Sequence, residues 1–151
     1  MPHIKSRYLN GQRGTGYHAS FDGIANGAIA QYDIVVAVSV DGDRVKWRKA
    51  DANVAGRRAG VMGIADHAAA AGGDRIRIVS HKLIKTVDTS AATAAGYPVY
   101  LSNTGGGWTA TAPTNAMVVG TVLVDDASNG VVLLAPAHCR NAFDADGVVE
   151  D

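Results

Sequence analysis

The chain has 151 residues, enough for one domain with tails, and its 14 basic and 14 acidic residues give a formal net charge of zero. A zero balance excludes binding to nucleic acid or an anionic membrane by bulk charge, which needs a positive excess. The single cysteine, Cys139, excludes an intrachain disulfide and a cysteine-rich zinc site. No apolar run approaches the ~20 residues that span a bilayer, and no secretory signal is visible. We therefore expect neither a nucleic-acid nor a membrane partner.

The charges are unevenly distributed along the chain. Residues 1–20 hold three bases and no acid, whereas residues 140–151 hold one base and four acids, which leaves ten of each between them. This pattern divides the chain into an N-terminal arm (1–20), a body (21–139) and an acidic tail (140–151). Charged residues make up 19% of the chain, below the ~25% typical of soluble domains, which indicates either a surface partly covered by partners or a chain that is simply rich in alanine and glycine.

The arm combines a loose backbone with spaced apolar side chains that could act as anchors. Three glycines interrupt it and no strand or helix period persists, but apolar side chains recur among the bases. Such a segment either becomes ordered against a partner or stays a disordered terminus. The first interpretation makes the following residues candidates for partner binding: Ile4, Lys5, Arg7, Tyr8, Leu9, Arg13, Tyr17 and Phe21.

The body has the pattern of an all-β protein with little or no helix. Short apolar or alternating runs are separated by turn residues such as Asp41-Gly42-Asp43, whose Asp-Gly step suits a tight hairpin. This spacing predicts a small barrel or a sandwich, without deciding between them. The nine predicted strands cover residues 29–40, 44–49, 61–65, 75–79, 82–87, 98–101, 108–111, 118–124 and 131–134.

Other local signals concern a helix, a tryptophan and several glycines. Residues 90–95 are either one helical turn closed by Gly96 or a loop, and 67–71 are too short for a stable helix. Alternation places Trp47 in the core, opposite the solvated bases of its strand.

Residues 104–107 are expected to form a flexible hairpin tip. Gly63 and Gly120 lie early in two similar strand–loop–strand units and indicate a bulge or a close backbone approach.

No pattern of catalytic or metal-binding residues is found. His138 and Cys139 are adjacent and would face opposite ways on a strand, and the Asp125-Asp126 pair lies in a predicted turn without calcium-loop spacing. The one glutamate, Glu150, is in the tail. No glycine cluster has the flanking strand and helix that a phosphate loop requires. We therefore expect no catalytic residue, no metal and no cofactor, and a protein that is not an enzyme.

Residues 27–136 resemble the capsid cement, or head decoration, proteins of tailed bacteriophages. The best-matching stretch is Gly96-Tyr97-Pro98-Val99-Tyr100-Leu101, followed by a glycine turn and Trp108-Thr109-Ala110-Thr111. Residues 117–122 and 131–134 continue it, and the earlier half matches through 60–65, 68–74 and 76–79. These are strand-and-turn patterns and carry no catalytic signature.

This resemblance implies a β-tulip-like protein that is made in the cytoplasm of a bacterial host and binds the outer surface of the virion capsid. The implied partners are the major capsid protein and two further copies of the chain, as a homotrimer at three-fold and quasi-three-fold positions. The implied role is to bridge neighbouring capsid subunits and to stabilise the shell against the pressure of packaged DNA. A virion-surface adhesion module that binds glycans or the host surface, with Trp108 beside the glycine turn as its candidate aromatic, remains the alternative.

Overall fold

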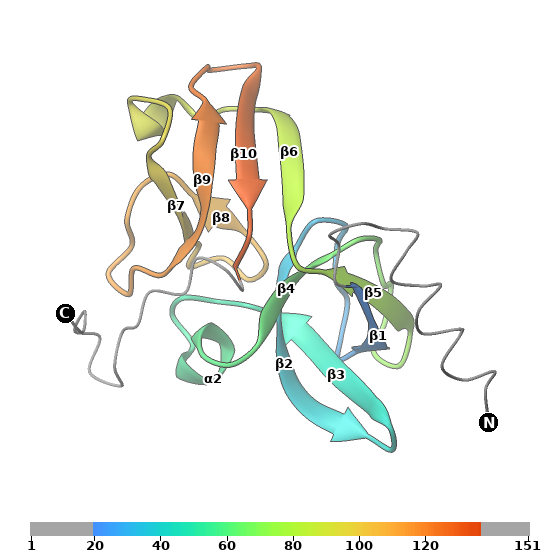
Figure 1. The fold of residues 1–151 in the computed structure, drawn as a ribbon. Coiled ribbons are helices and arrows are strands. Elements are labelled where there is room, and N and C mark those ends of the chain that lie inside the picture. Colours follow the sequence, from blue (N-terminus) through green and yellow to red (C-terminus); the bar gives the residue numbers. More distant parts are fainter. Residues whose placement is uncertain (1–19, 137–151) are drawn as a thin grey trace, which may run out of the picture.

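A computed structural model, which describes residues 20–136, consists of a closed five-stranded barrel joined to a second five-stranded sheet, the half-barrel (Figure 1). The predicted all-β class is confirmed, and the structure has ten strands where nine were expected. The strands are β1 (Ser20–Ala25), β2 (Ile34–Asp41), β3 (Arg44–Lys49), β4 (Met62–Ala65), β5 (Arg75–Val79), β6 (Lys82–Val87), β7 (Pro98–Leu101), β8 (Trp108–Thr109), β9 (Val118–Val124) and β10 (Gly130–Leu134).

Strand order places the first half of the chain in the barrel and the second half in the other sheet. The barrel order is β1-β3-β2-β4-β5, in which β1 and β3 are parallel and the other pairs antiparallel. The half-barrel order is β6-β10-β9-β7-β8, antiparallel throughout. Two residues, Ser80 and His81, connect β5 to β6 and so carry the chain from one sheet to the other.

The additional strand, β1, closes the barrel. It pairs with β5 over five residues, from Ser20 opposite Val79 to Ile24 opposite Arg75. The predicted strand 29–40 is shorter than expected, because a turn at Tyr32 (φ 68°) precedes β2 and the Asp33 carboxylate accepts a hydrogen bond from the Ala30 N–H at 2.8 Å. Ile29 instead forms an isolated bridge with Ala69.

Two apolar clusters form the core and share strand β2. Because side chains alternate along a strand, Val35 points into the barrel with Trp47 and Ile78, as expected for Trp47. Ile34 and Val36 point the other way, into a larger cluster between the barrel and the half-barrel. The continuous apolar run of β2 therefore results from burial on both faces. The half-barrel residues of that second cluster include Val99, Leu101, Val119, Val122, Val132 and Leu134.

The glycine turn at 104–107 is a packed contact and not the flexible tip that the sequence predicted. Gly106 is buried, donates its N–H to Ala50 O at 2.7 Å and accepts the Ile34 N–H at 2.8 Å. Its φ of 85° and the nearby Asp33 carboxyl leave no space for a side chain. The expectation was wrong because the partner of this turn is the barrel, which lies more than 50 residues earlier in the sequence.

Helical structure is limited to two short segments among residues 20–136. The α-helix α2 (Ala55–Arg58) was not predicted, whereas the 3-10 turn η1 (Ser90–Ala92) falls within the expected helical turn. Neither has the length or apolarity needed to cross a bilayer.

Candidate interaction surfaces

The predicted arm residues lie almost entirely outside the described part of the chain. Ile4, Lys5, Arg7, Tyr8, Leu9, Arg13 and Tyr17 belong to residues 1–19, so their binding role stays a prediction. Phe21 is the exception, because it lies in β1. The residue is 48% exposed, and its ring stacks on Trp47 with ring centroids 6.4 Å apart. Phe21 thus belongs to the barrel wall and lies next to the point where the arm begins.

The half-barrel has an apolar outer face. Directly paired residues in a sheet project to the same side, and Leu83, Leu133, Thr121 and Pro98 form one such row across β6, β10, β9 and β7. The buried residues of these strands project to the opposite side, into the core. With two neighbouring rows, this outer sheet face comprises Leu83, Lys85, Pro98, Tyr100, Thr109, Val118, Thr121, Val124, Val131 and Leu133.

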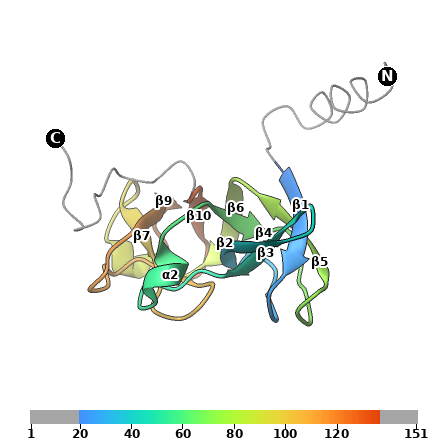
Figure 2. The same ribbon diagram turned by 90° about the horizontal axis from the view of Figure 1, so that it is seen from below.

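The outer sheet face is unusually poor in charge for an exposed surface. Lys85 is its one charged member, while Leu83 and Val124 are 48% and 45% exposed. No other described strand or helix covers it, and Figure 2 shows that β1 begins on the same side of the molecule. Apolar side chains that are exposed together on one face are a feature of interaction sites, which makes this face a candidate.

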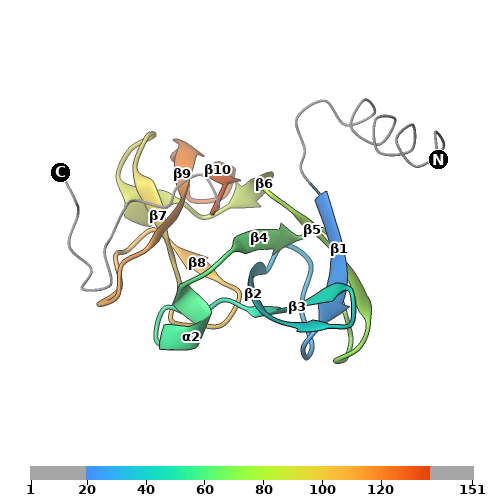
Figure 3. The same ribbon diagram turned by 60° about the horizontal axis from the view of Figure 1, so that its bottom comes forward.

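A second feature is a pocket of about 450 Å³ on the barrel, here called the basic pocket. Among its lining residues, Arg77 forms an ion pair with Asp22 at 3.7 Å and donates its backbone N–H to His67 Nε2 at 3.2 Å. Arg44 and Arg75 are exposed and have no ion-pair partner among residues 20–136. The barrel view in Figure 3 shows β1 between β3 and β5, the strands that carry these arginines. The pocket is lined by Asp22, Gly23, Arg44, His67, Arg75, Ile76 and Arg77.

The end of the half-barrel that lies away from the barrel is acidic. Asp88 and Asp126 meet there because Thr89 is fully buried, donates its hydroxyl to Val124 O at 2.9 Å and accepts the Asp126 N–H at 3.0 Å. The Ser90 hydroxyl and N–H, which donate to Asp88, lower the pKa of that carboxyl. The N–H groups of Asn129 and Ser128 lower the pKa of Asp126. With the neighbouring Asp125, these residues are called the acidic tip.

Acid is expected to destabilise the protein through this tip. The folded-state pKa values of Asp88 and Asp126 lie below the ordinary 3.8, so their contribution is complete above that pH and is lost as the pH falls through the lowered values. Urea unfolding measured between about pH 5 and pH 2 is expected to give a falling free energy of unfolding. Asp126→Asn keeps an acceptor oxygen but removes the titration, so its decline should be shallower; an equal slope would contradict this origin.

Two expectations about chemistry concern Trp108 and metal ligands. Trp108 pairs with Leu101 and packs against the main core cluster, so its ring supports the fold and does not stand out as a glycan platform. Within residues 20–136, no group of three or more His, Cys, Asp or Glu side chains is placed to hold a metal ion.

Sequence reasoning missed both the outer sheet face and the basic pocket. Each depends on which strands pair, and pairing partners lie tens of residues apart in the chain. One signal was present in the sequence, since no Lys or Arg occurs between residues 86 and 139. That gap marks the half-barrel as the weakly charged half of the body.

The fold has a counterpart among solved structures. It is similar to the head fiber gp8.5 N base of bacteriophage phi29, with a TM-score of 0.51 and 14% sequence identity. The similarity covers 82% of this chain and 98% of that chain. No family model and no curated protein matches the sequence. At this identity the similarity establishes a shared fold.

Proposed function

We propose that this chain is a structural protein of a phage head that binds the outer surface of the capsid as a cement protein. In this role it bridges neighbouring major capsid protein subunits and stabilises the shell against the pressure of packaged DNA. It acts as a homotrimer at three-fold and quasi-three-fold positions of the virion. The observation that carries the proposal is the fold shared with almost the whole of a phage head fiber base.

The surface of the half-barrel supports this proposal. The outer sheet face offers a mainly apolar contact with a single lysine, as expected of a surface that is covered in an assembly. Because β1 begins on the same side of the molecule, an arm that extends from Ser20 starts on the side to which the outer sheet face points (Figure 2). One copy then makes two contacts with the shell, through the sheet face and through the arm.

Bridging follows from having two contacts on one subunit. If the sheet face rests on one capsid subunit and the arm reaches the next, separating the two subunits requires breaking a contact. Three linked copies multiply weak contacts through a high effective concentration, so each contact can be modest while the trimer remains bound.

The test is co-sedimentation of the purified full-length chain with expanded heads that lack it. We expect saturable binding to expanded heads and none to unrelated particles of similar size. Absence of binding at a concentration well above that needed for a specific interface would overturn the proposal.

Deletion of residues 2–19 is expected to reduce this binding at least about tenfold, because it removes the apolar anchors and three bases together. The deletion ends before Ser20 and leaves β1 whole, so the barrel is retained. The matched control carries an arm of the same composition in scrambled order, which separates anchor spacing from charge. Unchanged binding after deletion would remove the arm from the contact.

A further inference from the structure

Charge is separated within the folded body in a way that the zero total conceals. Residues 20–85 hold all ten bases of the described chain and seven of its ten acids, whereas residues 86–136 hold no base and three acids. Those three acids, Asp88, Asp125 and Asp126, form the acidic tip. The barrel strands instead carry the arginines of the basic pocket. Positive and negative charges are therefore separated in the body. The barrel carries a basic site, and the end of the half-barrel carries an acidic one.

The carboxylates of the acidic tip are preorganised to accept hydrogen bonds from a positively charged group. In both Asp88 and Asp126, the contacts with backbone N–H groups are made by Oδ1. These bonds hold each carboxylate in a fixed orientation and leave Oδ2 without a partner among residues 20–136. A fixed, ionised carboxylate loses little side-chain entropy when it binds a guanidinium.

The basic pocket contains arginines that can donate hydrogen bonds to carboxylates. Arg77 already has a partner in Asp22, but the Arg44 and Arg75 guanidiniums have no carboxylate partner within residues 20–136. Both arginines are among the residues that line one cavity of about 450 Å³. Guanidinium groups match carboxylates in a two-bond geometry, so a ligand with two or more carboxylates suits this site.

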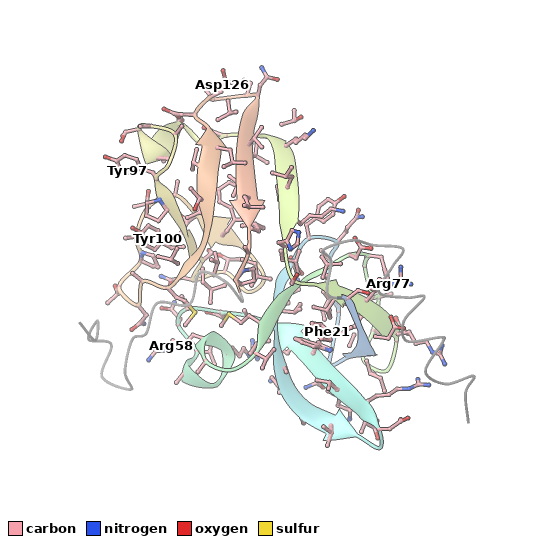
Figure 4. All side chains as sticks on the ribbon, viewed as in Figure 1. Phe21, Arg58, Arg77, Tyr97, Tyr100 and Asp126 are labelled. Carbon is pink, nitrogen blue, oxygen red and sulfur yellow. The ribbon has the colours of Figure 1, made fainter. Side chains whose placement is uncertain are left out.

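A second copy of the chain brings these two sites together. Figure 4 shows Asp126 at the upper end of the half-barrel and Arg77 on the barrel, at opposite parts of the molecule. Both belong to ordered strands or their tight turns, so one copy cannot place its own tip in its own pocket. We propose that the acidic tip of one copy docks in the basic pocket of the next.

This contact joins two different surfaces of identical subunits. Such head-to-tail contacts close into a ring when the rotation between subunits is suitable, and otherwise form an open chain. The inference supplies a contact for the homotrimer of the proposed function and rests on it to that extent. Its test needs no capsid, so failure here can be distinguished from failure to bind heads.

The experiment is sedimentation velocity of the full-length chain at several salt concentrations. Wild-type self-association should weaken as salt rises, since the Debye length falls below ~10 Å above 0.1 M ionic strength. The exposed residues Arg75 and Asp125 form no ion pair among residues 20–136, so exchanging them preserves the fold. Arg75→Glu and Asp125→Lys, each alone, should weaken self-association at least about tenfold.

The two variants complement each other if the contact is head-to-tail. A chain with both Arg75→Glu and Asp125→Lys has an exchanged pair and should recover self-association. An equimolar mixture of the single variants should also recover association, because one contact between the two variants is wild-type and the other contains the exchanged pair. The matched controls are Arg48→Glu and Asp43→Lys, which make the same charge changes outside the pocket and the tip.

The self-association of these variants either supports or contradicts the contact between the acidic tip and the basic pocket. Loss in both single variants, recovery in the double variant and no loss in the controls would establish the contact. A wild-type chain that stays monomeric at all salt concentrations, single variants that associate like the wild type, or a double variant without recovery would overturn it. Circular dichroism on each variant shows whether any loss comes from unfolding.

Discussion

Replacing Leu83 with aspartate is expected to weaken binding to expanded heads at least about tenfold, without unfolding the chain. Leu83 lies on the edge strand β6, at one end of the row formed with Leu133 and Thr121, and is 48% exposed. Its remaining burial in a contact would contribute about 1 kcal/mol, and an unpaired carboxylate at the same place would add a desolvation cost. In a trimer this loss occurs at three sites.

The matched control for this change is Val40→Asp. Val40 is 71% exposed and lies on the β2–β3 hairpin of the barrel, away from the outer sheet face. It receives the same charge on an apolar residue that is even more exposed than Leu83, so head binding should remain at the wild-type level. If Leu83→Asp binds heads as tightly as Val40→Asp does, the outer sheet face is not the capsid contact.

Gly120→Ala is expected to have the largest effect on stability. Gly120 lies in β9, between β10 and β7, and an added Cβ would meet the carbonyl oxygen of Leu133 and lie 2.9 Å from Val99 Cγ2. The carbonyl cannot retreat without breaking the β9–β10 pairing of Gly120 with Leu134. Overpacking of this kind costs about 1–3 kcal/mol or more. For a domain of this size, the melting temperature should fall by on the order of 10 °C.

Gly56→Ala provides the control for the glycine prediction. Gly56 lies in α2, has nothing within 4 Å of an added Cβ, and its backbone is already helical. There alanine should be neutral or stabilising by up to about 1 kcal/mol, because glycine is the poorer helix former. Thermal unfolding of both variants separates the two cases, and equal melting temperatures would contradict a close approach at Gly120.

Much of the strand pattern could be predicted because local signals define it. Strands β3, β5, β6, β7 and β9 have the predicted bounds, since alternating or β-branched runs are flanked there by turn residues. Strand β1 was missed because Ser20-Phe21-Asp22-Gly23 has neither alternation nor β-branched residues. Its extended form depends on pairing with β5, a contact across more than 50 residues. The choice between barrel and sandwich depended on the same pairing.

The candidate surfaces were harder to predict than the strands. The valine and leucine runs of β9 and β10 are the same for a strand buried on both faces and for one that exposes an apolar face. Only the absence of a covering layer distinguishes them. Likewise Arg44 and Arg75 lie 31 positions apart, and they line one pocket because β1 inserts between β3 and β5.

The outer sheet face, the arm, the acidic tip and the basic pocket have different roles in the proposed function. The apolar outer sheet face and the arm would contact the shell, while the acidic tip and the basic pocket would link one copy to the next. The outer sheet face has a single lysine, so its contact with the shell does not compete with the charged contacts between copies. Salt should therefore dissociate isolated trimers more readily than it releases the chain from heads.

The central claim is most directly tested by the number of copies of this chain relative to the major capsid protein in purified particles. Quantitative mass spectrometry of gradient-purified virions provides this ratio. A cement protein that fills the three-fold and quasi-three-fold positions should approach one copy per major capsid protein. A handful of copies per particle would contradict the account and indicate a vertex, portal or tail position.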